Sequence, residues 1–107
     1  MPTFSSMCSK MHLDLRQDHV HIIRSILETY VPGIEVWAFG SRVRAEARPA
    51  SDLDIVLMTD QPLDWLTLAE LCEAFSVSML PMKVDVLDWS VLSQEMRERI
   101  EHEHIVL

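Results

Sequence analysis

The sequence predicts an α+β fold, an α/β two-layer domain with helices mainly on one face of a small mixed β-sheet. Three observations predict it. Short β-branched and aromatic runs alternate with segments of helical apolar spacing, in the order α-β-α-β-α-β-α. The chain has 107 residues, enough for one domain with its own core. Hydrophobic residues make up 49% of the chain, which argues against a disordered protein.

Two helices are expected in the first three quarters of the chain. Residues 13–30 carry apolar side chains three or four positions apart, with Asp14 as the N-cap and Pro32-Gly33 ending the helix. Residues 64–77 form the second helix, which begins at Asp64 and ends before Pro81. Its apolar face is broad and comprises Trp65, Leu66, Leu68, Ala69, Leu71, Cys72 and Phe75.

A last helix is expected after Asp88 or Ser90, either of which suits an N-cap. Leu92, Met96 and Ile100 fall on one stripe of this helix. Its charged residues are expected to form a solvated face: Glu95, Glu98, Glu101 and Glu103, with Arg97 and Arg99.

Three strands are predicted at residues 34–39, 52–58 and 82–87, and a short fourth at 105–107. The helix at 64–77 joins the second and third strands, so these two can be parallel through a right-handed crossover. Only residues 41–51 join the first and second strands, with 41–47 as a short helix or turn, so antiparallel pairing is expected there.

The domain is expected to span residues 13–107, preceded by a flexible extension at 1–12. The extension has no apolar segment typical of a signal peptide, and no apolar run reaches membrane-spanning length. The two cysteines, Cys8 and Cys72, form no disulfide framework. These features favour a soluble, cytoplasmic protein with reduced thiols.

The charge of the chain argues against binding nucleic acid through general attraction to its backbone. The formal net charge is −8, although nine residues are basic. Three of these, Arg42, Arg44 and Arg48, lie beside Gly40-Ser41 and predict a local anion site. The pattern favours a small phosphorylated ligand and a protein partner over a nucleic-acid duplex.

The candidate site combines a glycine turn with carboxylates on two strands. Gly40-Ser41 ends the first strand, and its backbone N–H groups can approach a phosphate. Ten residues separate Ser41 from Asp52, and Asp52 and Asp54 point to one face of the second strand. Asp85, on the third strand, is expected beside them. Oxygen ligands of this kind suit Mg²⁺ or Mn²⁺.

Asp85 is the most informative of these residues. Between Val84 and Val86, a carboxylate is costly to remove from water unless it has a partner or a metal. The alternative is an ion pair of Asp85 with Lys83 or an arginine, or an exposed position on the sheet. The histidines, including His102 and His104, are expected to be solvated. Trp37, Trp65 and Trp89 are expected in the core.

These residues resemble the signature of the DNA polymerase β nucleotidyltransferase superfamily. That signature is a hydrophobic residue, Gly-Ser, about ten residues, Asp-x-Asp, and a third acidic residue on a following strand, here Gly40-Ser41, Asp52-Leu53-Asp54 and Asp85. From about residue 13 to 107 the chain resembles the minimal nucleotidyltransferase (MNT) branch, a catalytic palm without a substrate domain. Members usually have Gly-Ser-x-Ala-Arg-Gly in the turn, where this chain has Val43 and Ala45 at the fourth and sixth positions.

The resemblance implies an active, metal-dependent enzyme with ATP as its substrate. Asp52, Asp54 and Asp85 would be the catalytic residues and would bind two divalent ions, with Asp85 accepting the proton of the attacking hydroxyl. Gly40, Ser41, Arg42 and Arg44 would bind the phosphates. Arg42 and Arg44 could equally be surface charges.

The resemblance also suggests a partner. In MNT–HEPN toxin–antitoxin pairs the MNT antitoxin transfers AMP from ATP to a tyrosine of an all-helical HEPN ribonuclease toxin, a reaction called AMPylation. The acidic chain fits a basic partner of that kind in a hetero-oligomer. Two alternatives remain: a contact-only or nucleotide-binding antitoxin without catalysis, and AMP transfer to a small molecule or RNA with an additional subunit.

Overall fold

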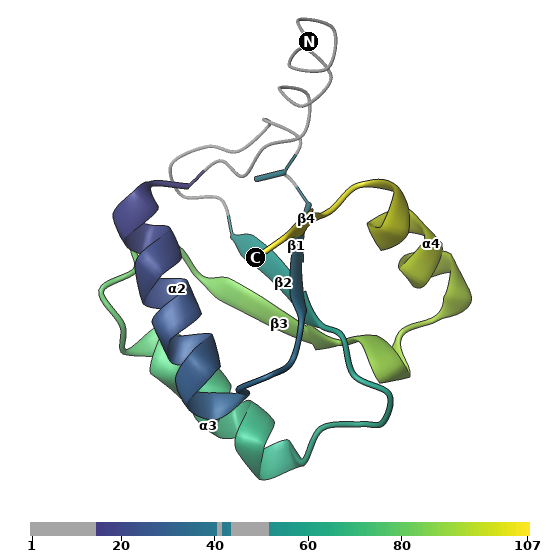
Figure 1. Cartoon of the computed structure of the whole chain (residues 1–107), viewed down its shortest axis with the longest axis horizontal. Helices are drawn as coiled ribbons and strands as arrows, with labels where there is room; N and C mark the ends of the chain where they lie inside the picture. The colour runs from purple at the N-terminus through teal and green to yellow at the C-terminus, as the bar shows by residue number, and fades with distance from the viewer. Residues whose placement is uncertain (1–14, 41, 44–51) are drawn as a thin grey trace, which may run out of the picture.

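A four-stranded mixed sheet with strand order β3-β2-β1-β4 forms the centre of the protein (Figure 1). The computed structural model describes residues 15–40, 42–43 and 52–107. Its strands are β1 (Val36–Phe39), β2 (Leu53–Leu57), β3 (Val84–Asp88) and β4 (Ile105–Val106). β1 pairs antiparallel with β2 and with β4, whereas β2 and β3 are parallel. The predicted topology is therefore confirmed, including the short fourth strand.

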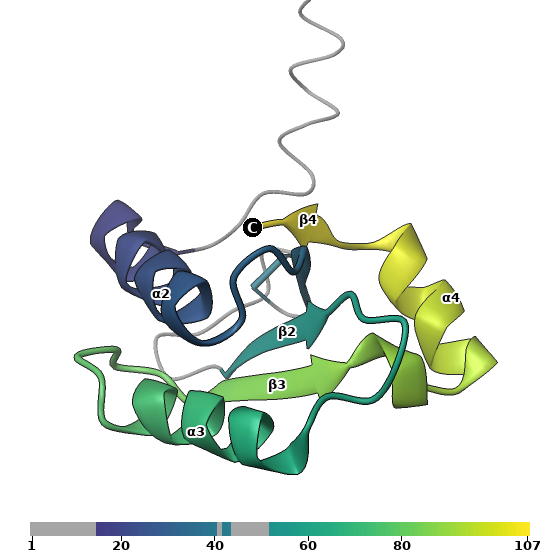
Figure 2. The ribbon, with the colours of Figure 1, turned by 60° about the horizontal axis from the view of Figure 1, so that its bottom comes forward.

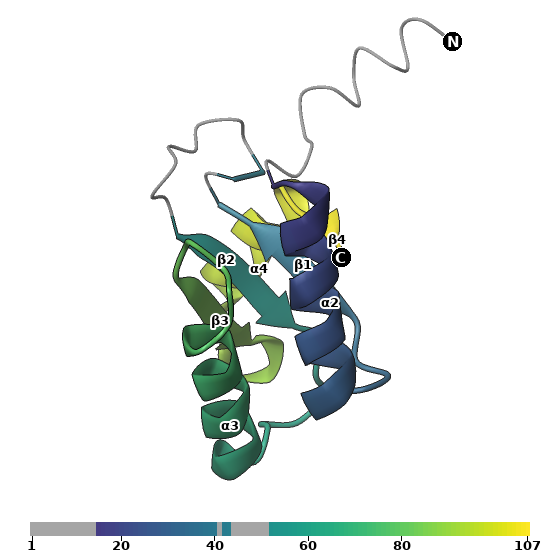
Figure 3. The same ribbon diagram turned by 90° about the vertical axis from the view of Figure 1, so that its left-hand side faces the viewer.

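Two helices cover one face of the sheet, and a third lies on the other side. Helices α2 (Gln17–Tyr30) and α3 (Trp65–Ser76) form a layer on one face, and α4 (Gln94–His102) lies on the opposite side of the sheet (Figures 2 and 3). A short 3-10 helix, η1 (Trp89–Val91), leads from β3 toward α4. The α+β prediction, with helices mainly on one face, is confirmed. Within the described ranges, no helix is long and apolar enough to cross a membrane.

The main core lies between the sheet and the first helical layer. Alternate residues of β2, Leu53, Ile55 and Leu57, are completely buried there, because side chains of a strand alternate between its two faces. Val84 and Val86 of β3 pack against the same core. The helical layer contributes its most buried side chains, which are Ile23, Leu27, Leu71 and Phe75. Consequently Asp54 and Asp85 emerge on the opposite face.

The ends of α2 and α4 differ from the predictions. α2 begins at Gln17 and its N-cap is Arg16, which makes no side-chain cap hydrogen bond. The predicted cap Asp14 lies outside the described residues and two positions before the observed cap. Ser93, whose hydroxyl accepts from the Met96 N–H, caps α4. Asp88 instead caps η1, because an intervening 3-10 turn starts directly after β3. The predicted extension at residues 1–12 also lies outside the described part.

The start and end of α3 agree with the prediction, but its buried face is narrower than the predicted apolar face. The Asp64 carboxylate accepts from the Thr67 N–H at 3.3 Å, so the predicted N-cap is confirmed. Only Leu71 and Phe75 of this helix are buried. Trp65 is 76% exposed, so its predicted core position is wrong. It is the first residue of α3, whereas the buried residues of this helix, Leu71 and Phe75, lie in its second half.

Candidate active site

The candidate site is built on a register that places Asp54 and Asp85 side by side. Asp54 of β2 pairs with Asp85 of β3 in the parallel ladder. Neighbouring strands lie about 4.8 Å apart, and paired side chains emerge on the same face, so both carboxylates can reach one cation. The predicted juxtaposition of these two acids on neighbouring strands is what the structure has.

Gly40 meets Asp54 from the other neighbouring strand. Phe39 pairs with Asp54 across the antiparallel β1–β2 ladder, and Gly40 follows with φ +86°. A β-carbon added at Gly40 would lie 2.5 Å from Asp54 Oδ2. Glycine is therefore required twice, once for its left-handed backbone and once for the space beside the carboxylate.

Asp52 lies just outside β2, where the chain enters the strand, and it is exposed. Its two-residue spacing from Asp54 places both on the same side of the extended chain. Among the described residues, however, no three Asp, Glu, His or Cys side chains are gathered closely enough to form a metal-binding cluster. Three hard carboxylate donors fit Mg²⁺ chemically, and their side chains would have to converge on the ion.

Asp85 is less desolvated than its neighbours suggested. Its side chain is 40% exposed and lies 3.7 Å, Oδ1 to Nζ, from the even more exposed Lys83. The expectation of a costly buried carboxylate is therefore wrong, since Val84 and Val86 face the core while Asp85 faces away from it. The ion pair considered as an alternative is present, although an exposed pair of this kind contributes little stability.

The remaining phosphate-binding candidates are only partly within the described structure. Ser41 and Arg44 lie outside the described residues. The Val43 N–H donates to the Gly40 carbonyl at 3.0 Å, so the chain turns directly after Gly40. Val43 is completely buried and Arg42 is 6% exposed. This burial shows that the surface-charge alternative is wrong for Arg42, whereas its contact with phosphates stays a prediction.

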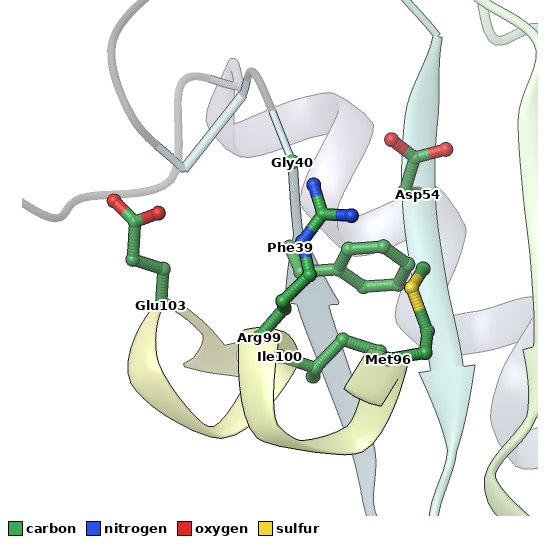
Figure 4. Close-up of a pocket in the computed structure, with 7 residues that line it drawn as sticks. All are labelled: Phe39, Gly40, Asp54, Met96, Arg99, Ile100 and Glu103. Carbon is green, nitrogen blue, oxygen red and sulfur yellow. The ribbon is translucent and has the colours of Figure 1, made fainter. Parts of the chain in front are cut away.

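A pocket of about 340 Å³ opens between Asp54 and helix α4 (Figure 4). Gly40 and Asp54 form one wall, and Met96 and Arg99 of α4, with Glu103 directly after the helix, line the other side. Phe39 and Ile100 supply apolar surface between them. The sequence alone predicts no role for Arg99 here, because an arginine between glutamates on a helix is typical of a solvated face. The proximity of α4 to β1 was the missing information.

Hydrogen bonds at the η1–α4 junction hold α4 in place over this pocket. The carboxylate of Asp88 accepts from the Thr59 hydroxyl, from the Leu63 N–H at 2.7 Å and from Ser90. Burial alone would raise the pKa of Asp88, but these hydrogen bonds lower it below its ordinary value. Arg97 donates to the Trp89 carbonyl at 2.9 and 3.1 Å. The prediction of a solvated Arg97 is therefore wrong.

Stacked rings fix the end of α4 on β1. The His104 and Trp37 rings stack with centroids 3.8 Å apart, and Trp89 meets Trp37 edge to face at 5.5 Å. His104 Nδ1 lies 3.0 Å from the Ile100 carbonyl oxygen. The expected solvated role of His104 is thus wrong, whereas His102 is exposed as expected. These contacts hold the segment after α4 against β1, next to the pocket.

The arrangement suits metal-assisted chemistry on a phosphate ester. The half-buried turn at Gly40, which lines the pocket, can receive an anion, and two in-register carboxylates can hold a divalent cation beside it. Asp85 is accessible enough to accept a proton from an incoming hydroxyl.

Comparison with known proteins agrees with this geometry. The model of a family described as polymerase beta, nucleotidyltransferase, matches residues 21–107. The chain is 44% identical over 101 residues to the probable protein adenylyltransferase MntA of Haemophilus influenzae, covering 94% of this chain and 89% of that protein.

Solved structures share the fold. A toxin–antitoxin crystal structure with AMP-PNP has a TM-score of 0.68 at 23% identity, covering 80% of this chain and 69% of that chain. A complex of tri-AMPylated Shewanella oneidensis HEPN toxin with its MNT antitoxin has a TM-score of 0.66 at 22% identity, covering 86% and 71%. At these identities the likeness establishes the fold.

Proposed function

The chain belongs to the polymerase β nucleotidyltransferase family, and we propose that it transfers AMP from ATP to a tyrosine hydroxyl of a helical HEPN toxin, acting as the antitoxin. One observation carries the proposal. Asp54 of β2 and Asp85 of β3 are in register on neighbouring strands, and Gly40, at the end of β1, packs against Asp54 from the other side. The adenylyltransferase name of the 44% identical relative and the AMPylated toxin bound to a structurally similar antitoxin support the choice of reaction and partner. The reaction would take place in the cytoplasm, within a hetero-oligomer and without direct binding to nucleic acid.

The proposed site residues are those of the sequence motif. Asp52, Asp54 and Asp85 would hold two divalent ions, Mg²⁺ or Mn²⁺. Charge neutralisation on the triphosphate is the chemistry that such ions supply when bound. Asp85 would accept the proton of the attacking tyrosine hydroxyl, for which its 40% exposure leaves room.

The phosphates of ATP would lie at the turn after β1. Gly40 and Ser41, with Arg42 and Arg44, would bind them, chiefly through backbone N–H groups at the turn. The oxygen of the acceptor forms a bond to the α-phosphorus, the bond from that phosphorus to the bridging oxygen breaks, and pyrophosphate leaves.

One observation favours the non-catalytic alternative. Lys83 lies 3.7 Å from Asp85 and could neutralise this carboxylate without a metal ion. An antitoxin that inhibits by contact alone would not need Asp54, so mutation separates the two functions.

The test is to incubate the chain with Mg²⁺, ATP and the HEPN protein encoded beside it, and to weigh that protein by mass spectrometry. We expect the mass of one or more AMP units on a tyrosine, lost with Asp54→Asn. Asp60→Asn is a matched control, because Asp60 is also acidic but lies exposed beyond the opposite end of β2. An unmodified partner that is still neutralised by Asp54→Asn would establish the contact-only function instead.

A further inference from the structure

Two arginines on the same helix have opposite environments. Arg97 donates to the carbonyl oxygens of Trp89 and Ser90 and lies 5.3 Å from the centre of the Trp89 ring. Arg99, two positions on, is exposed and lines the pocket with Gly40 and Asp54. In the part of the chain that the structure describes, the side chain of Arg99 makes no hydrogen bond or ion pair, and its backbone carbonyl accepts from the Glu103 N–H. Arg97 therefore stabilises the fold, and the guanidinium of Arg99 is available to a ligand.

The side chain of Arg99 is directed toward the candidate phosphate site. Figure 4 shows its guanidinium pointing to the space between Gly40 and Asp54, while Glu103 points away from that space. A guanidinium has five donors in a planar fork that fits two phosphate oxygens at once. The lack of a side chain at Gly40 keeps the opposite wall open to an anion.

The order of the strands decides which phosphate Arg99 can reach. In an in-line displacement, the attacking and leaving oxygens lie on opposite sides of the reacting phosphorus. Asp85, the proposed acceptor of the proton from the incoming hydroxyl, lies on β3, on one side of Asp54. Gly40 and α4 lie on the other side, next to β1. The leaving group is therefore expected on the side of Arg99.

We propose that Arg99 binds the leaving pyrophosphate, that is, the β- and γ-phosphates of ATP. This inference rests on the proposed function and adds to it a residue outside the sequence motif. Arg99 contacts the substrate through its guanidinium and neutralises the charge that accumulates as the bond from the α-phosphorus to the bridging oxygen breaks. The apolar surface of Phe39, Met96 and Ile100 beside it excludes water from part of this contact.

The test compares nucleotides with and without these phosphates. Binding of ATP and of AMP to the chain alone is measured by calorimetry with Mg²⁺, without any toxin and hence without turnover. For Arg99→Gln we expect ATP binding to weaken about 10- to 100-fold, as for a lost charged hydrogen-bond pair, and AMP binding to stay within about twofold. Arg99→Lys keeps the charge without the fork and should fall between the two.

Arg24→Gln is the matched control. Arg24 is an exposed arginine on α2, on the opposite side of the sheet, so this variant has the same change in net charge. It should bind ATP as the unmodified chain does, and thermal melts should show that both variants are folded.

Two results would overturn the assignment of Arg99 while leaving the proposed function intact. In the first, Arg99→Gln weakens AMP binding as much as ATP binding, which places the residue elsewhere on the nucleotide. In the second, it changes neither affinity. If the folded, unmodified chain does not bind ATP with Mg²⁺ at all, both the inference and the proposed function fail.

Discussion

Replacing Gly40 by alanine tests the contact that organises the site. The backbone at Gly40 has φ +86°, and a left-handed conformation costs an L-residue about 1–2 kcal/mol. The added β-carbon would also lie 2.5 Å from Asp54 Oδ2, whereas Asp54 Cγ and Cβ are at 3.4 and 3.6 Å. The carboxylate oxygen must therefore move. Turning this side chain off its rotamer costs about 0.5–1.5 kcal/mol more.

Two further variants separate the backbone strain from the clash. Gly33 has φ +81° and nothing within 4 Å of an added β-carbon, so Gly33→Ala should show the backbone cost alone. In an Asp54→Ala background the obstructing oxygen is absent, so Gly40→Ala should also lose only about 1–2 kcal/mol there. A double-mutant cycle then gives the energy of the clash as the coupling between positions 40 and 54.

The free energies of unfolding can be measured by urea denaturation of the unmodified chain and of the single and double variants of two cycles, one pairing positions 40 and 54 and one pairing positions 33 and 54. We expect a coupling of about 0.5–1.5 kcal/mol between Gly40→Ala and Asp54→Ala, and none between Gly33→Ala and Asp54→Ala. Binding of ATP with Mg²⁺ should fall in Gly40→Ala, because Asp54 is displaced, but not in Gly33→Ala. A zero coupling at Gly40 would refute the close approach on which the site is built.

Three further predictions concern charge. Asp88→Asn should lower the free energy of unfolding by about 2 kcal/mol at pH 7, because charged hydrogen bonds are lost. Since folding lowers the pKa of Asp88, the stabilisation by its carboxylate is present above the unfolded pKa of about 3.9 and disappears as the pH falls through the folded pKa. The urea midpoints of the two proteins should therefore converge in acid, and a constant gap would contradict the assignment. Lys83→Gln should change stability by less than about 1 kcal/mol and leave Mg²⁺-dependent ATP binding equal or tighter by calorimetry; weaker binding would show that Lys83, rather than a metal, is the working partner of Asp85. Removal of divalent ions with a chelator should sharply weaken ATP binding, whereas equal affinity would exclude the metal role of Asp52 and its neighbours.

The sequence was sufficient to predict the sheet and the acids on it. Alternation placed Leu53, Ile55 and Leu57 inside and Asp54 outside, which is a property of the strand itself. The short connection after Gly40 predicted the antiparallel pair, and the helix before β3 allowed the parallel one. These predictions succeeded because each depends on residues that are close in sequence or joined by one connection.

The sequence was insufficient wherever a side chain's environment came from a distant segment. Arg97, Arg99 and His104 share a polar helical end, and no local pattern distinguishes them. Their roles depend on Trp89 for Arg97, on the Gly40–Asp54 wall for Arg99 and on Trp37 for His104. The exposure of Asp85 was misjudged for the same reason, because sequence neighbours indicate hydrophobicity but not which face of an edge strand is covered.

The mixed topology explains why a chain this small can assemble such a site. Because β1 is antiparallel to β2, the C-terminal end of β1, where Gly40 follows, lies beside the first residues of β2. Because β3 is parallel to β2, Asp85 lies near the N-terminal end of β3, beside Asp54 near the N-terminal end of β2. A parallel β1 would carry Gly40 to the far end of Asp54's strand, and an antiparallel β3 would move Asp85 away. The same order sets a direction across the site, with the pocket of Arg99 on the β1 side and the exposed carboxylate of Asp85 on the β3 side. With the proposed roles of Asp85 and Arg99, this strand order would place the attacking hydroxyl and the leaving pyrophosphate on separate sides of Asp54.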